Sequence, residues 1–175
     1  MKTIIKKFHF IVAIVLTFAQ ASAADREPEQ VVQAYIAAFK DKNKEAMLSC
    51  LSEVFLVNFK SSYISKFNSY DNEMRKSALE IFGVATLDQL KELSGRVMLS
   101  AFLDSPSSAT YWQSFDSVEL IVEVERIEIS VDHASVRSWL YTKKTLPAKV
   151  ETIYSLAKTG NEWRIDRFQK KLIEP

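Results

Sequence analysis

The chain has 175 residues, with 23 basic and 22 acidic side chains and a formal net charge of +1. This length predicts one domain with a substantial core, and the balanced charge argues against nucleic-acid binding. The sole cysteine, Cys50, excludes an intrachain disulfide. Its neighbours Met47, Leu48 and Leu51 favour a buried side chain over a free thiol that links two chains.

Residues 1–23 have the organisation of a signal peptide. Three lysines precede an apolar segment at 8–18, and Ala21-Ser22-Ala23 supplies the small residues that signal peptidase needs. The apolar segment is shorter than the roughly 20 residues that span a bilayer, which favours cleavage over an uncleaved anchor. Cleavage removes three lysines and no acidic residue, so the net charge becomes −2. We therefore expect an exported protein, periplasmic or secreted, without a transmembrane anchor, in which residues 24–175 form a single domain.

Helical patterns dominate the first half of this domain. Apolar residues recur at helical spacing after Pro28 and predict a helix that ends near Lys40. Asn43 suits the N-cap of a second, short helix. Residues 54–59 are mostly apolar, and periodicity does not decide between a strand and a helix there.

Two N-cap signals follow. Asp71 or Asn72 can cap a helix that stops at Gly83. Thr86 and Gln89 have the spacing of a capping box. The helix that they open is expected to run to about Asp104 and to present Leu87, Leu90, Val97 and Phe102 on one face.

Residues 117–169 predict a meander of four antiparallel strands. Apolar and mostly acidic residues alternate from Val118 to Glu125, and a bulge near Glu125-Arg126 would keep the later apolar residues on the same face. Those later residues are Ile127, Ile129 and Val131. Further strands are predicted at 133–143, 150–158 and 163–168, with Thr159-Gly160-Asn161 as the last hairpin turn. Helices first and an antiparallel sheet last indicate an α+β fold.

Two segments carry a family resemblance. The opening helix and its polar turn read VVQAYIAAFKDKN at 31–43, and the terminal hairpin reads YSLAKTGNEWRI at 154–165. With the long bent strand between them, they resemble the nuclear-transport-factor-two-like superfamily, a cone-shaped α+β barrel. The resemblance covers residues 28–51 and 117–169, so residues 54–115 would be a helical insert.

The resemblance implies N-terminal helices packed in the concave face of a curved antiparallel sheet of four or more strands. It also implies a pocket at the open end of the cone. Ketosteroid isomerase and scytalone dehydratase carry acid–base groups in that pocket, whereas many secreted relatives are not catalytic. The chain is most similar to this secreted, non-catalytic type.

Aromatic side chains with polar tips are the leading candidates for a ligand site, because they suit an amphipathic ligand. The expected pocket-lining residues are Tyr35, Tyr111, Trp112, Trp139, Tyr141 and Tyr154. Core packing is the alternative for these residues, and we favour it for Trp163.

The sequence gives little support for catalysis or for a metal. The histidine that follows the signal peptide, His133, adjoins Asp132 at a turn, where side chains are usually solvated. Asp116, Asp132 and Asp166 are the carboxyls that could act as a base in a pocket. No residue is assigned a catalytic role, and no ligand cluster predicts a metal or another cofactor.

Three functional hypotheses follow. The first is a non-enzymatic module that holds a small apolar or amphipathic molecule in the cone. The second is a protein-interaction module of the cell envelope, either a homodimer through the sheet or an accessory subunit. The third is an isomerase or hydrolyase with an Asp or Tyr in the pocket.

Overall fold

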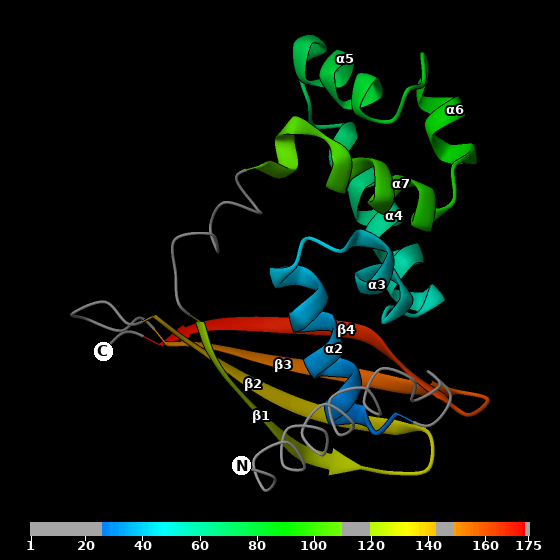
Figure 1. The fold of residues 1–175 in the computed structure, drawn as a ribbon. Helices are drawn as coiled ribbons and strands as arrows, with labels where there is room; N and C mark the ends of the chain where they lie inside the picture. The colour runs from blue at the N-terminus through cyan, green and yellow to red at the C-terminus, as the bar shows by residue number, and fades with distance from the viewer. Residues whose placement is uncertain (1–25, 110–119, 143–148, 174–175) are drawn as a thin grey trace, which may run out of the picture.

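The computed structural model describes residues 26–109, 120–142 and 149–173. Helices come first, and one antiparallel sheet follows them, so the predicted α+β fold is confirmed (Figure 1). The helices are α2 (Pro28–Lys40), α3 (Lys44–Ser49), α4 (Glu53–Phe67), α5 (Asn72–Ile81), α6 (Leu87–Glu92) and α7 (Gly95–Asp104), followed by a 3₁₀ turn at Pro106–Ser108. The strands are β1 (Leu120–Ile129), β2 (His133–Thr142), β3 (Lys149–Thr159) and β4 (Glu162–Ile173).

Side-chain caps fix where most of the helices begin. Each capping side chain accepts a hydrogen bond from the backbone N–H three residues later, which satisfies a donor that the helix leaves open. The capping residues are Asn43, Ser52, Asp71, Thr86 and Ser94. The cap at Ser52 also settles the undecided segment 54–59, which lies in α4 and is helical.

The helix predicted from Thr86 to about Asp104 is two helices. The first ends at Glu92, and Leu93 is extended, with φ −65° and ψ 141°. The Ser94 hydroxyl then accepts a hydrogen bond from the Val97 N–H at 3.2 Å and begins α7. Because this break rotates α7 relative to α6, Val97 is 50% exposed and does not share a buried face with Leu90.

The sheet has the strand order β1-β2-β3-β4, so β1 and β4 are its edges. The predicted bulge in the first strand is confirmed, and it lies between Arg126 and Glu128. The last hairpin turns at Gly160, whose φ of +63° is a conformation that glycine adopts without strain. A parallel bridge joins Leu51 to Ile165 and ties the segment before α4 to β4.

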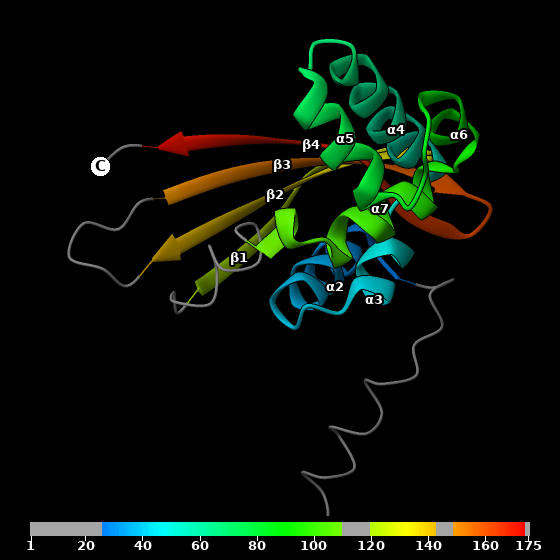
Figure 2. The same ribbon diagram turned by 90° about the horizontal axis from the view of Figure 1, so that it is seen from above.

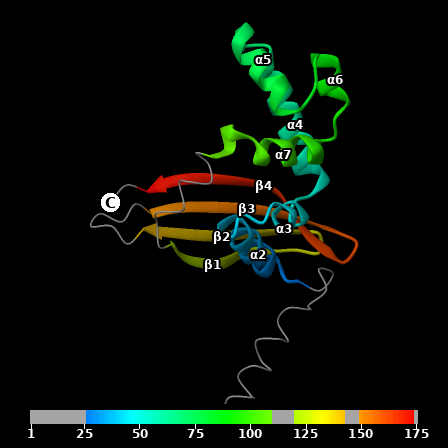
Figure 3. The same ribbon diagram turned by 45° about the horizontal axis from the view of Figure 1, so that its top comes forward.

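The helices are distributed unevenly around the sheet. Figures 1 and 2 show α2 lying across one face, while α4 to α7 gather beyond the β4 edge. Figure 3 shows the same arrangement, with α4 to α7 standing away from β1. We call the face in contact with α2 the inner face, and it carries Val136, Tyr154 and Phe168. The opposite, outer face carries Arg137, Trp139 and Glu151.

Two hydrophobic clusters hold these layers together. The larger cluster joins α2 and α3 to the inner face of the sheet, and it includes Trp163, as predicted. Cys50 is 4% exposed in this cluster, which confirms the buried interpretation, and burial raises the pKa of its thiol. The smaller cluster lies among the later helices and contains Phe67, Ala78, Phe82, Leu90 and Met98. Among the described residues, no helix combines the length and the apolar character needed to cross a membrane.

The bulge keeps Ile129 on the inner face, opposite Ala134, as predicted, but Ile127, Ile129 and Val131 are not buried. Their exposed fractions are 45%, 45% and 83%. The helix that covers the sheet begins at Pro28, beside Arg126, so β1 continues past the end of its cover.

An ion-pair cluster joins the start of α2 to β1. Arg126 Nη2 donates to Glu29 Oε2 at 2.7 Å and to Glu27 Oε2 at 3.0 Å. The hydrogen bond from Arg126 lowers the pKa of Glu29 below its ordinary value of 4.5. A lowered pKa stabilises the fold at pH values above 4.5, and this contribution is lost as the pH falls through the pKa of the folded state.

Arg126→Gln is therefore expected to remove this acid-dependent contribution. The variant should be less stable than the wild type near neutral pH, by a small margin because the ion pair is exposed to solvent. This margin should shrink towards zero below pH 4.5. Urea denaturation at a series of pH values measures both limits, and a difference that does not depend on pH would contradict the assignment.

Candidate ligand-binding groove

Two of the six expected pocket residues meet in the core. The rings of Tyr35 and Tyr154 lie 6.2 Å apart, and each lies close to the Phe168 ring, at 6.3 and 6.0 Å. Tyr35 is 7% exposed and Tyr154 is 4% exposed. Both residues therefore lie behind Phe168 as part of the hydrophobic core.

The other four candidates do not join them in the described part of the chain. Trp139 lies on the outer face, where the Arg137 guanidinium is 5.6 Å from its ring centroid. Tyr141 belongs to β2, opposite Ile121 and Lys149, and its side chain is outside the described atoms. Tyr111 and Trp112 lie outside the described residues.

A groove between α4 and β4 gathers a different set of aromatic rings. Its volume is about 510 Å³, which is within the usual range for small-molecule sites. The aromatic rings that line it are Phe55, Phe59, Tyr63, Tyr70, Phe102 and Phe168. All six are partly exposed, whereas the core rings of Tyr35 and Trp163 are buried.

The spacing of aromatic residues along α4 builds one wall of this groove. Phe55, Phe59 and Tyr63 recur every four residues, so they lie on one stripe of the helix. Phe55 stacks on Phe168 of β4 at 5.6 Å, and Phe59 contacts Phe102 of α7 at 6.2 Å. The four-residue spacing is visible in the sequence, and it is the signal that could have identified this wall.

A carboxylate lies at one end of the groove because β4 contains a bulge. Arg167 pairs with Ser155 and Ile165 pairs with Leu156, so Asp166 has no residue opposite it on β3. Bulges often redirect a side chain in this way. The Oδ1 atom of Asp166 is buried and has no hydrogen-bond partner in the described part of the structure. Asp166 itself lines the groove, so its carboxyl group can act as an acceptor for a ligand there.

The other polar side chains that line the groove are Asn58, Ser62, two basic residues and two tyrosines. Lys66 and Arg167 line its exposed rim. Burial raises the pKa of Tyr63, and the neighbouring Tyr70 raises it further. The Tyr63 hydroxyl therefore stays protonated at neutral pH and can donate a hydrogen bond.

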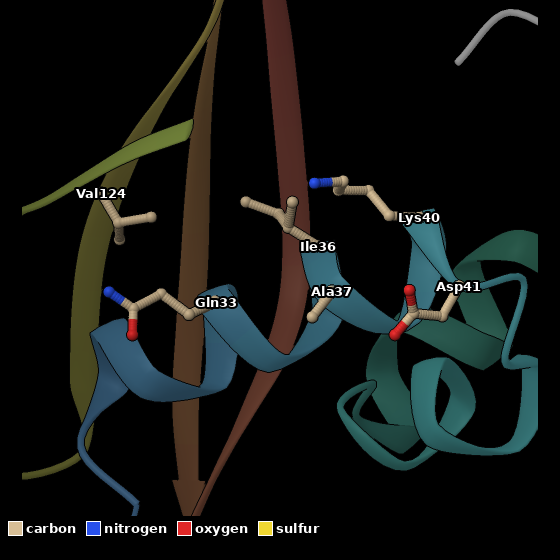
Figure 4. A pocket seen from close by; sticks show the side chains of 6 residues that line it. All are labelled: Gln33, Ile36, Ala37, Lys40, Asp41 and Val124. Atoms are coloured by element: carbon tan, nitrogen blue, oxygen red, sulfur yellow. The ribbon is translucent and has the colours of Figure 1, made fainter. Parts of the chain in front are cut away.

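A second, smaller hollow lies between α2 and β1 (Figure 4). Its volume is about 330 Å³, and Gln33 and Ile36 of α2 face Val124 of β1 across it. Its other lining residues are Ala37, Lys40 and Asp41, and the side chains of both charged residues are solvated. The described residues that line this hollow offer a ligand three apolar side chains and no aromatic ring.

The acid–base and metal candidates remain weak in the described residues. His133 and Asp132 are both exposed at the β1–β2 turn, as predicted. No group of three metal-binding side chains occurs in the part of the chain that the structure describes. Of the three aspartates considered from sequence, Asp116 lies outside the described residues, and Asp166 is the one that reaches the groove.

In comparisons with known proteins, the chain matched no protein-family model and no curated protein sequence.

Proposed function

We propose that this protein is a non-enzymatic module that binds a small amphipathic molecule in the groove between α4 and β4. The observation that carries this proposal is the set of six partly exposed aromatic rings around one groove of about 510 Å³. Water-exposed aromatic surface is unfavourable, and a ligand with an apolar body would cover it. The Asp166 carboxyl group and the Tyr63 hydroxyl would fix the orientation of such a ligand.

Export and superfamily membership belong to the same proposal. The signal-peptide pattern of residues 1–23 supports export to the periplasm or the medium. The curved sheet that follows the N-terminal helices supports the resemblance to the nuclear-transport-factor-two-like superfamily. The groove differs in position from the expected pocket, because it lies at the β4 edge, against the helices inserted at 54–115.

Titration with Nile red, a neutral amphipathic dye, tests the proposed function directly. We expect saturable binding of one dye per chain, with the emission shifted to the blue as the dye leaves water. Native mass spectrometry of protein purified from its own host should then show a retained small molecule. An absence of saturable dye binding would contradict the proposal.

We propose a second function, homodimer formation through the outer face of the sheet, because the charges on this face are self-complementary. The β1 side carries Glu123, Glu125 and Glu128, and the β4 side carries Arg164 and Lys171. Within the chain, Glu125 also pairs with Arg137, and Arg164 also pairs with Glu162. We call the acidic residues on the β1 side the acidic column and the basic residues on the β4 side the basic column. If the outer faces of two copies stack about a two-fold axis parallel to the strands, the acidic column of each copy lies over the basic column of the other. Such complementarity stabilises one orientation of association. Trp139 and Ile153 would lie near the centre of this interface.

If the protein forms this dimer, its molecular mass in solution should depend on the salt concentration and on the side chain at Trp139. Sedimentation equilibrium should give a dimer at low ionic strength that dissociates as salt screens the opposed columns. Trp139→Asp should make the protein monomeric at every salt concentration, because it places a charge at the centre of the interface. Thr159→Asp changes an exposed hairpin residue and should leave the dimer intact. A wild-type monomer at low salt would contradict this second proposal.

A further inference from the structure

Lys170 lies on the inner face of β4 next to the aromatic groove. Lys170 lies two residues after Phe168, so both side chains project from the same face of the strand. The Lys170 ammonium is 5.6 Å from the centroid of the Phe168 ring, and that ring lines the groove. A ligand that extends past Phe168 would therefore meet this ammonium.

Lys170 has no ion-pair partner among the described residues. By contrast, Arg126, Arg137 and Arg164 each form an ion pair with a carboxylate. The protein atoms around the ammonium lower the pKa of Lys170 by desolvation. The side chain nevertheless retains exposed surface, so a solute can reach it. An accessible, partly desolvated cation without an ion-pair partner in the described ranges is a favourable partner for an anion.

Two buried hydroxyl groups lie in line with Lys170 across the inner face of the sheet. Lys170 pairs with Thr152 on β3, and Thr152 pairs with Ser138 on β2. Both hydroxyl-bearing residues are 0% exposed, and neither side-chain oxygen has a hydrogen-bond partner in the described structure. Directly opposed residues have Cβ atoms about 5 Å apart, which places the Thr152 hydroxyl beside the stem of Lys170.

We propose that Lys170 binds the anionic group of an amphipathic ligand whose apolar body lies in the aromatic groove. This inference rests on the proposed function and narrows its ligand class to amphipathic anions. Asp166 lies four residues before Lys170, about 13 Å along an extended strand. Its carboxylate repels an anion at that end of the groove, so the ligand is held with its charged group towards Lys170.

Lys66 and Arg167 also line the groove, and they are the competing anion partners. Both side chains are exposed, so water and salt weaken their attraction for an anion. The Lys170 side chain is exposed as well, but its ammonium lies 5.6 Å from the Phe168 ring centroid and desolvation lowers its pKa, so a charge-assisted hydrogen bond there contributes more to affinity. We therefore assign the charge selectivity to Lys170.

Displacement of Nile red by two ligands that share one apolar body tests this assignment. Phenylbutyrate ends in a carboxylate, and phenylbutanol ends in a hydroxyl group. Wild-type protein should bind phenylbutyrate about tenfold more tightly, as one charge-assisted hydrogen bond predicts. Lys170→Gln should remove this preference and leave the affinities for Nile red and phenylbutanol unchanged.

Lys171→Gln is the matched control, because Lys171 lies on the outer face opposite Glu151. It should keep the preference for the carboxylate. If the wild type binds Nile red but shows no preference, the inference is wrong while the proposed function stands. If Lys66→Gln or Arg167→Gln removes the preference and Lys170→Gln does not, the assignment to Lys170 is wrong. If Nile red does not bind at all, the proposed function is wrong, and the inference about Lys170 is wrong with it.

Discussion

Gly95→Ala is expected to lower the free energy of unfolding by about 3 kcal/mol, the upper end of the usual cost of overpacking. A Cβ atom at this position would lie 2.1 Å from the backbone oxygen of Leu56 and 2.5 Å from its carbonyl carbon. Gly95 is the first residue of α7, and Leu56 lies inside α4, so a contact between two helix backbones would have to open. For a chain of this size, the loss corresponds to a decrease in Tm of roughly 10 °C.

Gly160→Ala is the control for this variant. Gly160 has a φ of +63°, and no neighbouring atom lies within 4 Å of the Cβ that alanine would add, so this change costs only conformational strain of about 1 kcal/mol. Thermal unfolding followed by circular dichroism compares the two variants. If Gly95→Ala were no more destabilising than Gly160→Ala, the close packing of α4 on α7 would be contradicted. Such a result would also remove the support that this packing gives to the groove wall.

Ser62→Trp is expected to weaken Nile red binding by at least about a hundredfold, because an indole would occupy the volume of the groove. Ser62 lines the groove from α4, and its side chain is exposed. The larger side chain can therefore enter the groove without displacing the core. The free energy of unfolding should change by no more than about 0.5 kcal/mol, as is usual for surface substitutions.

Ser61→Trp adds the same side chain one residue earlier on the same helix. Ser61 is also exposed, and it is not among the residues that line the groove. This variant should bind Nile red as the wild type does. Fluorescence titration of the two variants separates loss of the site from a general effect of a surface tryptophan. Equal binding by both variants would place the dye somewhere other than the groove.

The positions of the helices and strands were predictable where local chemistry determines them. Asn43 and Thr86 are caps in the sequence and in the structure, because a capping side chain bonds to a backbone group only three residues away. Gly160 marks the last hairpin turn because the turn needs a positive φ, which glycine adopts without strain. The alternation of Val136, Arg137 and Ser138 assigns each residue of β2 to a face without knowledge of its partners.

The candidate site was less predictable, since its walls come from distant parts of the chain. Tyr35 and Tyr154 have the polar tips expected of pocket residues, but the packing of α2 on β3 buries them. The groove instead combines Phe59 and Phe102 with Phe168, which are brought together by the packing of α4 against α7 and β4. No local pattern states which helix lies against an edge strand.

The sequence by itself determined the α+β order, the caps, the last hairpin turn and the faces of the strands, because these depend on interactions between residues close along the chain. The tertiary structure alone decided that β1 extends beyond its helical cover and that the β4 bulge directs Asp166 into a groove. These features depend on which surfaces are buried together, and burial is a property of the whole fold.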